Sequence, residues 1–335
     1  MDSLTHVVLG ASIGIAVMGR RTALWKAALW GAICNSLPDL DVFIDHGDVI
    51  RNVTFHRAES HALFYLTLAS PVVAAIIAAV NREWALFKRW WLATWLLLVS
   101  HPLLDLMTVY GTQLGLPFTD QPYGLGSIFI IDPLYTLPLI AGVAGSLASR
   151  GERRLRWAQA GLALSTLYLG WCAAAQQHVT NIAASSVRTQ GLQAQHMLVT
   201  PTPFNTVLWR IVVMTPAGYA EGYYSLLDRE PRIAFEQYPG RPDLYSALRG
   251  TWNVERIAWF SRGFFSMADR DGQVLITDLR MGQEPYYTFS FEVASRHSEM
   301  QPLASPRVVG QRVDVERGLA WLWRRARGEL LPSPR

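Results

Sequence analysis

Residues 90–106 read WWLATWLLLVSHPLLDL, an apolar stretch that ends in His101 and Asp105. Residues four apart lie on the same face of a helix, so both side chains can point at one ion. Ionisable groups are costly at membrane depth and are candidates for a functional role where they occur there. The stretch therefore predicts a membrane helix that carries part of a metal site. The alternative is a structural His–Asp pair in a helix kinked by Pro102.

Apolar stretches of this kind are confined to the first half of the chain. They cover residues 4–19, 23–37, 62–80, 90–106, 128–148 and 157–175. The pattern predicts a membrane α-helical bundle of about six segments, with at least four full spans, as a polytopic domain over residues 1–176. Residues 177–335 lack such stretches and are predicted to form a soluble, β-rich α+β domain.

Strand patterns support the second assignment. Alternating residues at 206–214 and 219–227 predict one pair of strands. An Arg-Asp-Gly turn at 270–272 predicts a second pair, at 263–268 and 274–279.

Basic residues gather in three of the predicted loops, at 20–26, 82–89 and 150–156, whereas residues 107–127 contain no Lys or Arg. The positive-inside rule places the three basic loops in the cytoplasm. Six segments then leave both termini, and residues 177–335, outside the cytoplasm. The net charge of +4 comes from these loops, so no nucleic-acid partner is expected.

This topology brings His and Asp residues from four elements to the external membrane face. The predicted metal ligands are His6, Asp39, Asp41, His56, His61, His101 and Asp105. Such a set suits zinc, or manganese. A bridging carboxylate, Asp39 or Asp105, would hold two ions about 3.5–4 Å apart, as in phosphoesterases. We therefore expect one or two divalent ions.

Other roles are open for several of these residues. Asp39 and Asp41 could cap a Pro-Asp turn. His56 and His61 would diverge by about 140° on one regular helix, so both can bind only if one lies in the loop or they bridge different parts; we expect at least one of them to bind. His6 lies four residues after Asp2, which could hold its ring or cap the helix. Arg57 offers a planar fork for a phosphate, and it is predicted to be catalytic together with Asp39 and Asp41.

Several motifs resemble the YdjM-like family of bacterial inner-membrane metal-dependent hydrolases. They are MDSLTH at 1–6, PDLD at 38–41, HRAESH at 56–61, HPLLD at 101–105, YGT at 110–112, LPF at 116–118, IDP at 131–133 and PTPFN at 201–205. Family members often carry Thr-His-Ser at the second histidine, where this chain has Ser60-His61-Ala62. The resemblance implies a multi-pass protein of the bacterial inner membrane.

The order of the ligands is more remotely similar to the zinc-dependent phospholipase C and P1 nuclease superfamily. That superfamily has a downstream His…His-x-x-x-Glu set for a third ion, which this sequence lacks. The likeness therefore implies a dinuclear site at most.

Together these features predict a membrane-bound, metal-dependent hydrolase that cleaves a phosphoester of a lipid or lipid-linked substrate. The His-Glu-x-x-His motif of zinc proteases is absent. The alternative is a non-catalytic membrane binding or assembly protein with a structural metal or a buried His/Asp network. A metal transporter would need ligands distributed through the depth of the bilayer, whereas these gather at one face.

Overall fold

The structure is a computed structural model that describes residues 1–296, 299–310 and 314–334. The chain divides into two compact units. The N-terminal unit contains Met1–Ile44, His56–Ala173 and Pro203–Asn205. The C-terminal unit contains Asp45–Phe55, Ala174–Thr202 and Thr206–Arg335. Two short segments, 45–55 and 203–205, therefore belong to the unit other than that of their chain neighbours.

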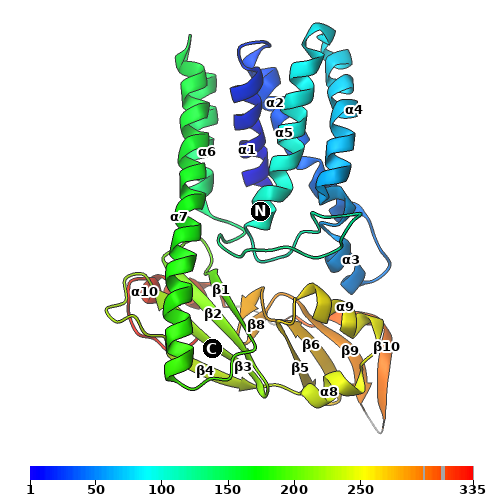
Figure 1. Ribbon diagram of the computed structural model, residues 1–335, viewed down its shortest axis with the longest axis vertical. Helices are drawn as coiled ribbons and strands as arrows, with labels where there is room; N and C mark the ends of the chain where they lie inside the picture. Colours follow the sequence, from blue (N-terminus) through cyan, green and yellow to red (C-terminus); the bar gives the residue numbers. More distant parts are fainter. Residues whose placement is uncertain (297–298, 311–313, 335) are drawn as a thin grey trace. The chain divides into compact units, whose positions relative to one another are not determined.

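The N-terminal unit is helical (Figure 1). Its helices are α1 (Ser3–Met18), α2 (Leu24–Ser36), α4 (Leu63–Asn81), α5 (Phe87–Leu106), α6 (Pro133–Ala148) and the first part of α7 (Arg153–Thr189), with the 3₁₀ turns η1 (Pro38–Phe43), η2 (Glu59–His61) and η3 (Trp84–Leu86). Helices α1 and α2 pack closely because small residues face each other. A Cβ atom on Gly10 would collide with the carbonyl group of Gly31, and one on Gly14 with that of Ala27.

The prediction of at least four full membrane spans is wrong. Among the described residues, α4 alone is long and apolar enough to cross a membrane. Helices α1 and α6 have 16 residues each, about 24 Å, against a hydrocarbon core of about 30 Å. The multi-pass arrangement and the orientation deduced from it are therefore not supported.

Helices α2 and α5 do not qualify as membrane spans for different reasons. Helix α2 has only 13 residues, because Pro38 follows it and opens η1. Helix α5 has 20 residues but carries Lys88 and Arg89 in its first turn and the pair His101 and Asp105 near its end. Apolar composition was visible in the sequence, whereas helix length and charge placement decide whether a segment can span.

The C-terminal unit is β-rich, as predicted. One antiparallel sheet has the order β1–β2–β3–β4 and the other β10–β9–β6–β5. The strands are β1 (His196–Pro201), β2 (Leu208–Thr215), β3 (Gly218–Ser225), β4 (Phe235–Pro239), β5 (Phe265–Arg270), β6 (Gln273–Asp278), β9 (Ser290–Arg296) and β10 (Met300–Val308), with the short pair β7 (Gly282–Gln283) and β8 (Tyr286–Tyr287). The predicted pairings of β2 with β3 and of β5 with β6 are confirmed.

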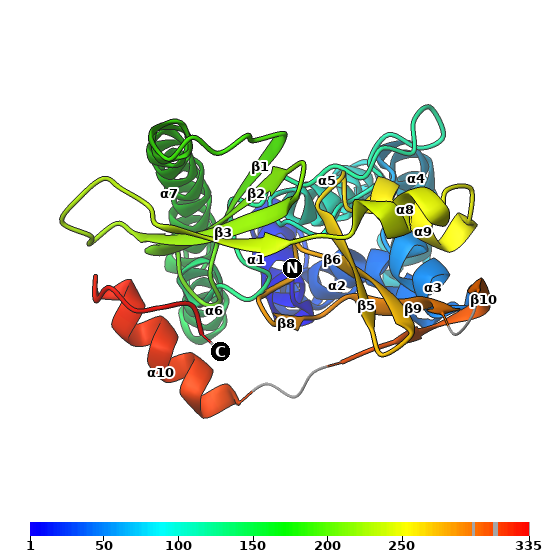
Figure 2. The ribbon, with the colours of Figure 1, turned by 90° about the horizontal axis from the view of Figure 1, so that it is seen from below.

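Helices cover these sheets. The end of α7 packs on the first sheet, where Val179 and Ala183 meet Trp209 and Ile211, and α10 (Val315–Ala326) lies across the opposite face (Figure 2). The second sheet packs against α3 (Val49–Phe55), α8 (Pro242–Ala247) and α9 (Trp252–Phe260). Each unit therefore has its own apolar core.

Candidate metal centre

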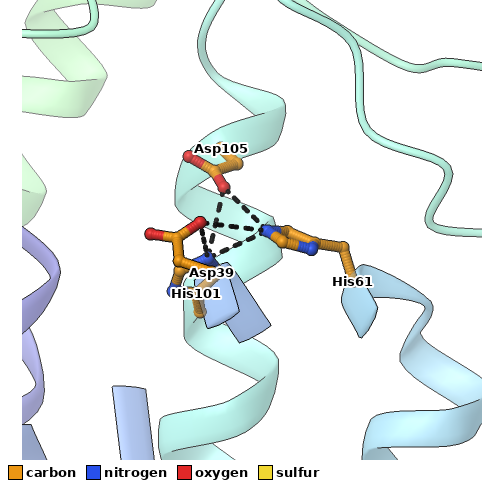
Figure 3. A group of neighbouring side chains, drawn as sticks. All are labelled: Asp39, His61, His101 and Asp105. Carbon is orange, nitrogen blue, oxygen red and sulfur yellow. Dashed lines mark hydrogen bonds and ion pairs between the residues drawn. The ribbon is translucent and has the colours of Figure 1, made fainter. Parts of the chain in front are cut away.

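Four side chains of the N-terminal unit point toward one another (Figure 3). They are Asp39 from η1, His61 from η2, and His101 and Asp105 from α5. One ligand atom of each lies within 4.8 Å of the other three. His61, His101 and Asp105 are fully buried, whereas the side chain of Asp39 is 22% exposed. The four-residue centre therefore opens at Asp39.

The distances between these atoms suit a tetrahedral ion. His101 Nε2 lies 3.0 Å from His61 Nε2, 3.3 Å from Asp39 Oδ1 and 3.3 Å from Asp105 Oδ2. His61 Nε2 lies 3.5 Å from the same oxygen of Asp39 and 3.4 Å from that of Asp105. Tetrahedral ligands about 2.0–2.1 Å from a zinc ion are about 3.3–3.4 Å apart. The four-residue centre thus has the size of a zinc coordination shell.

Hydrogen bonds fix the tautomers of both histidines. His101 Nδ1 lies 2.5 Å from the carbonyl oxygen of Asn35, so it donates its proton there. The hydroxyl of Ser60 donates to Asp41 at 2.5 Å and therefore accepts from His61 Nδ1 at 2.8 Å. When both imidazoles are neutral, each Nε2 has a lone pair directed at the centre.

Asp105 divides its two oxygens between two environments. Its Oδ2 atom faces the histidines and has no hydrogen-bond donor among the residues that the structure describes. Its Oδ1 atom accepts from Arg57 Nη2 at 3.1 Å, lies 3.3 Å from His6 Nε2, and contacts the amino group of Met1. Lone pairs therefore converge on one side of this carboxylate and donors on the other.

The structure separates the seven predicted ligands into two groups. Four of them form the centre, and His6, Asp41 and His56 lie around it. The ring of His6 stacks on that of His101, with centroids 3.7 Å apart. Asp2 caps α1 by accepting the Thr5 amide hydrogen, the simpler of its two expected roles.

Asp41 organises the loop beside the centre. Its Oδ1 accepts from His56 Nδ1 at 2.7 Å, and its Oδ2 accepts from the Arg57 amide at 2.9 Å as well as from Ser60. Burial raises the pKa of Asp41, but the hydrogen bonds from His56, Ser60 and the Arg57 amide hold it below its ordinary value. Burial likewise raises the pKa of Asp39, and contacts with His101 and His61 lower it below the ordinary value.

Arg57, the residue predicted to bind a phosphate, lies beside the four-residue centre. Its backbone has a positive φ of 66°, and its guanidinium group pairs with Asp105 and lies 4.9 Å from the ring centroid of Tyr110. Its Nε is buried without a hydrogen-bond partner among the described residues. The structure thus directs Nη2 to the carboxylate of Asp105 and Nη1 to the hydroxyl of Thr108, at 3.5 Å.

Sequence reasoning missed Asn35 and Ser60. Asn35 orients His101 through its carbonyl group and ties α2 to α5 by donating its amide hydrogens to the Leu97 carbonyl oxygen and the Ser100 hydroxyl. Ser60 connects Asp41 to His61. Their positions next to predicted ligand motifs were the available signal.

Comparisons with known proteins bear on both units. The model of the family described as YdjM inner membrane protein matches residues 1–179. The chain is 26% identical over 306 residues to the uncharacterized protein YfhP of Bacillus subtilis (strain 168), covering 86% of this chain and 89% of that protein. It is 30% identical over 125 residues to the inner membrane protein YbcI of Escherichia coli (strain K12), covering 36% of this chain and 69% of that one.

No solved structure matches the chain significantly. The remote likeness to phospholipase C and P1 nuclease receives no support from these comparisons. The names of the family and of the E. coli relative indicate an inner membrane protein. Because the family model covers more than half of the residues, this chain belongs to the YdjM inner membrane protein family.

Proposed function

We propose that this protein is a membrane-bound, metal-dependent hydrolase whose ion is held by Asp39, His61, His101 and Asp105. The observation that carries the proposal is the convergence of two imidazole lone pairs and two carboxylate oxygens with no hydrogen-bond donor for Asp105 Oδ2 among the described residues. Buried acceptors are stable only when they are paired. A cation at their centre would satisfy all four together.

The donor types favour zinc, with manganese as the second choice. Imidazole suits zinc, carboxylates suit both metals, and the distances between the donor atoms are those of a tetrahedral shell. We propose one ion rather than two. The second oxygen of Asp105, which a bridging role would require, already contacts Arg57, His6 and the amino group of Met1.

A bound ion of this kind acts as a Lewis acid and lowers the pKa of a water molecule. The chain supplies a candidate proton acceptor beside it. His56 donates its Nδ1 proton to Asp41, so its Nε2 is free to accept a proton. The ring of His56 lies 5.9 Å from that of His61, and its side chain is 21% exposed. His56 is therefore our candidate general base, positioned by Asp41.

The proposed substrate is a phosphoester of a lipid or a lipid-linked molecule. Helix α4, the candidate membrane span, begins at Leu63, two residues after His61. A membrane-spanning α4 would bring the four-residue centre to the level of the membrane surface, which supports this choice of substrate. Membership of an inner membrane protein family supports the same choice.

A structural metal is the second candidate, and one specific observation favours it. Four protein ligands can close a tetrahedral shell, whereas catalytic zinc keeps a position for water or substrate. The partial exposure of Asp39 and the pairing of His56 with Asp41 favour the catalytic reading. X-ray absorption spectroscopy of the zinc-loaded protein would separate the two, because a catalytic ion shows an additional exchangeable oxygen ligand.

The direct test compares wild type, His56→Ala and His101→Ala, each purified in detergent. Metal content would be measured by mass spectrometry, and hydrolysis on bis-p-nitrophenyl phosphate, phosphatidic acid and phosphatidylglycerol. We expect His101→Ala to lose both metal and activity. We expect His56→Ala to keep its metal and to lose about 100-fold or more in rate, the usual contribution of a general base.

Two other outcomes would contradict the proposal in different ways. A zinc-loaded wild type that cleaves no phosphoester would leave a structural metal as the better account. A wild type that binds no divalent ion would exclude both a catalytic and a structural metal. The four residues would then form a buried network that shares a proton.

A further inference from the structure

Three arginines line a cavity of about 270 Å³ in the N-terminal unit. They are Arg20, Arg21 and Arg89, and the same cavity is bordered by Leu155 and Gln159 of α7. The three arginine side chains are exposed, whereas Leu155 is buried against Ile15 and Leu24. The three-arginine pocket therefore has a cationic rim beside an apolar floor.

The local sequence explains why these side chains meet. Helix α1 ends at Met18, so Arg20 and Arg21 follow its C-terminus directly. Arg89 lies in the first turn of α5, and Leu155 lies in the first turn of α7. One end of α1 is thus brought to the beginning of two other helices.

The positive charges of the pocket are not balanced by protein carboxylates. Within the described part of the chain, none of the three arginines forms an ion pair. Glu83 is occupied by Thr22 at 2.6 Å and Trp90 at 2.9 Å. Like charges held together repel one another, and an anion between them removes that cost.

Helix electrostatics account for only part of this arrangement. Cations after a helix C-terminus are favourable, which explains Arg20 and Arg21 after α1. Arg89 lies at the N-terminal end of α5, where the helix dipole disfavours positive charge. The helix dipole therefore does not explain why Arg89 lies at the same cavity as Arg20 and Arg21, and an anion bound between the three side chains would offset its cost.

The pocket lies far from the metal centre. Met18, two residues before Arg20, follows His6 by 12 residues along α1, and Arg89 precedes His101 by 12 residues along α5, or about 18 Å in each helix. The two sites therefore occupy opposite ends of the same two helices.

The pocket also lies at one end of the candidate span. Helix α4 ends at Asn81, and Glu83, two residues later, accepts a hydrogen bond from Thr22, which follows Arg21. If α4 crosses the membrane, the arginines lie at the depth of lipid headgroups. Basic pockets at the ends of membrane helices are common binding sites for anionic headgroups.

We propose that the three-arginine pocket binds the phosphate group of an anionic phospholipid. The planar guanidinium fork matches phosphate oxygens in pairs, and Gln159 adds an amide donor beside it. Ala16 and Val17 line the same cavity and would contact the first apolar atoms of the lipid. The proposal goes beyond the hydrolase function and does not depend on it.

The test uses the full-length protein in a non-ionic detergent at about 0.15 M salt, where distant surface charges are screened. Isothermal titration calorimetry would measure binding of dihexanoyl phosphatidylglycerol, dihexanoyl phosphatidylcholine and inorganic phosphate. The pocket variant is Arg20→Gln with Arg89→Gln. The matched control is Arg150→Gln with Arg153→Gln, which removes the same charge from exposed arginines that do not line the cavity.

We expect wild type to bind phosphatidylglycerol saturably and phosphatidylcholine far more weakly. An arginine near an anionic headgroup contributes about 1 kcal/mol, so the pocket variant should bind about 30-fold more weakly, while the control changes little. Circular dichroism would check that all proteins are folded, and metal content should be equal in all three.

Three results would overturn the proposal. The first is the absence of saturable phosphatidylglycerol binding by wild type, and the second is an equal loss of binding in the pocket and control variants. Binding of inorganic phosphate without phosphatidylglycerol, lost in the pocket variant, would show a site for a soluble phosphate and exclude the lipid.

Discussion

Each unit of the molecule contains a buried polar cluster, and the two are built in opposite ways. In the C-terminal unit, Glu221 accepts from Arg210 Nη2 at 2.5 Å, from the Tyr223 hydroxyl at 2.5 Å and from the Tyr287 hydroxyl at 3.3 Å. In the four-residue centre of the N-terminal unit, lone pairs face lone pairs. The Glu221 cluster has donors for its acceptors, whereas the four-residue centre does not.

This difference separates a structural network from a candidate metal site. A buried carboxylate with three donors is complete within the protein and requires no ligand. Two imidazoles whose outer nitrogens are hydrogen-bonded, and whose inner nitrogens meet carboxylates, need either a shared proton or a metal cation between them, and the proposal is that a metal cation fills this place. Burial alone would have classed the two clusters together, since both are almost fully enclosed.

The largest expected effect is on metal content. Replacing His101 by Ala removes a donor from the centre of the four, so bound zinc should fall from a full equivalent to a small fraction. Glu221→Gln, in the other cluster, should leave zinc content unchanged. Elemental analysis of the two proteins makes the comparison. Equal zinc in wild type and His101→Ala would show that the metal lies elsewhere.

The next effect is on the stability of the C-terminal unit. Glu221→Gln leaves the buried guanidinium group of Arg210 without its counter-charge, which should lower the free energy of unfolding by about 3–5 kcal/mol. The double variant Arg210→Met with Glu221→Leu removes both charges and should lose less. Denaturant titration in detergent would measure both. A double variant less stable than Glu221→Gln would mean that the cluster is held by packing rather than charge balance.

A smaller effect should follow from the loss of Ser60. Ser60→Ala removes the acceptor that fixes the His61 tautomer, so zinc affinity should fall about 10–100-fold while the full equivalent still binds at saturation. Ser36→Ala is the matched control, because Ser36 donates only within α2, to the Ala32 carbonyl oxygen. Competition with a zinc chelator would give both affinities. Equal affinities would show that Asp41 or packing alone orients His61.

Some of this site could be predicted from the sequence, because it depends on regular structure. His101 and Asp105 meet because they are four apart on α5, and the spacing was sufficient to pair them. The hairpin of β2 and β3 was visible for a similar reason, since alternation and a short turn define it locally.

The positions of the other histidines and aspartates of the site depend on irregular backbone. His61 enters the centre and His56 does not, because Arg57 between them adopts a left-handed conformation and η2 follows. No periodicity encodes that turn. The same holds for Asp39 and Asp41, which lie in the 3₁₀ turn η1, where Asp39 reaches the histidines and Asp41 reaches Ser60.

The prediction of at least four full membrane spans was wrong for another reason. Apolar composition does not give the length of a helix: Pro38 and Pro133 set helix boundaries that leave α2 and α6 short. Helix α5 is long enough to span a membrane, but Lys88 and Arg89 in its first turn make it less apolar than a span requires.

The smallest effect is expected at an exposed ion pair, and it tests whether burial gives the Glu221 cluster its importance. Arg241 pairs with Asp243 through two hydrogen bonds, at 2.8 and 2.6 Å, a geometry as good as that of Arg210 and Glu221. Its side chains are 44% and 60% exposed, so water screens the attraction and replaces each lost contact. Asp243→Asn should therefore leave the free energy of unfolding unchanged within error, in the same titration that resolves Glu221→Gln. A loss comparable with that of Glu221→Gln would mean that ion-pair geometry, rather than enclosure, governs both clusters, and the contrast between the two units would then rest on the lone pairs of the metal centre alone.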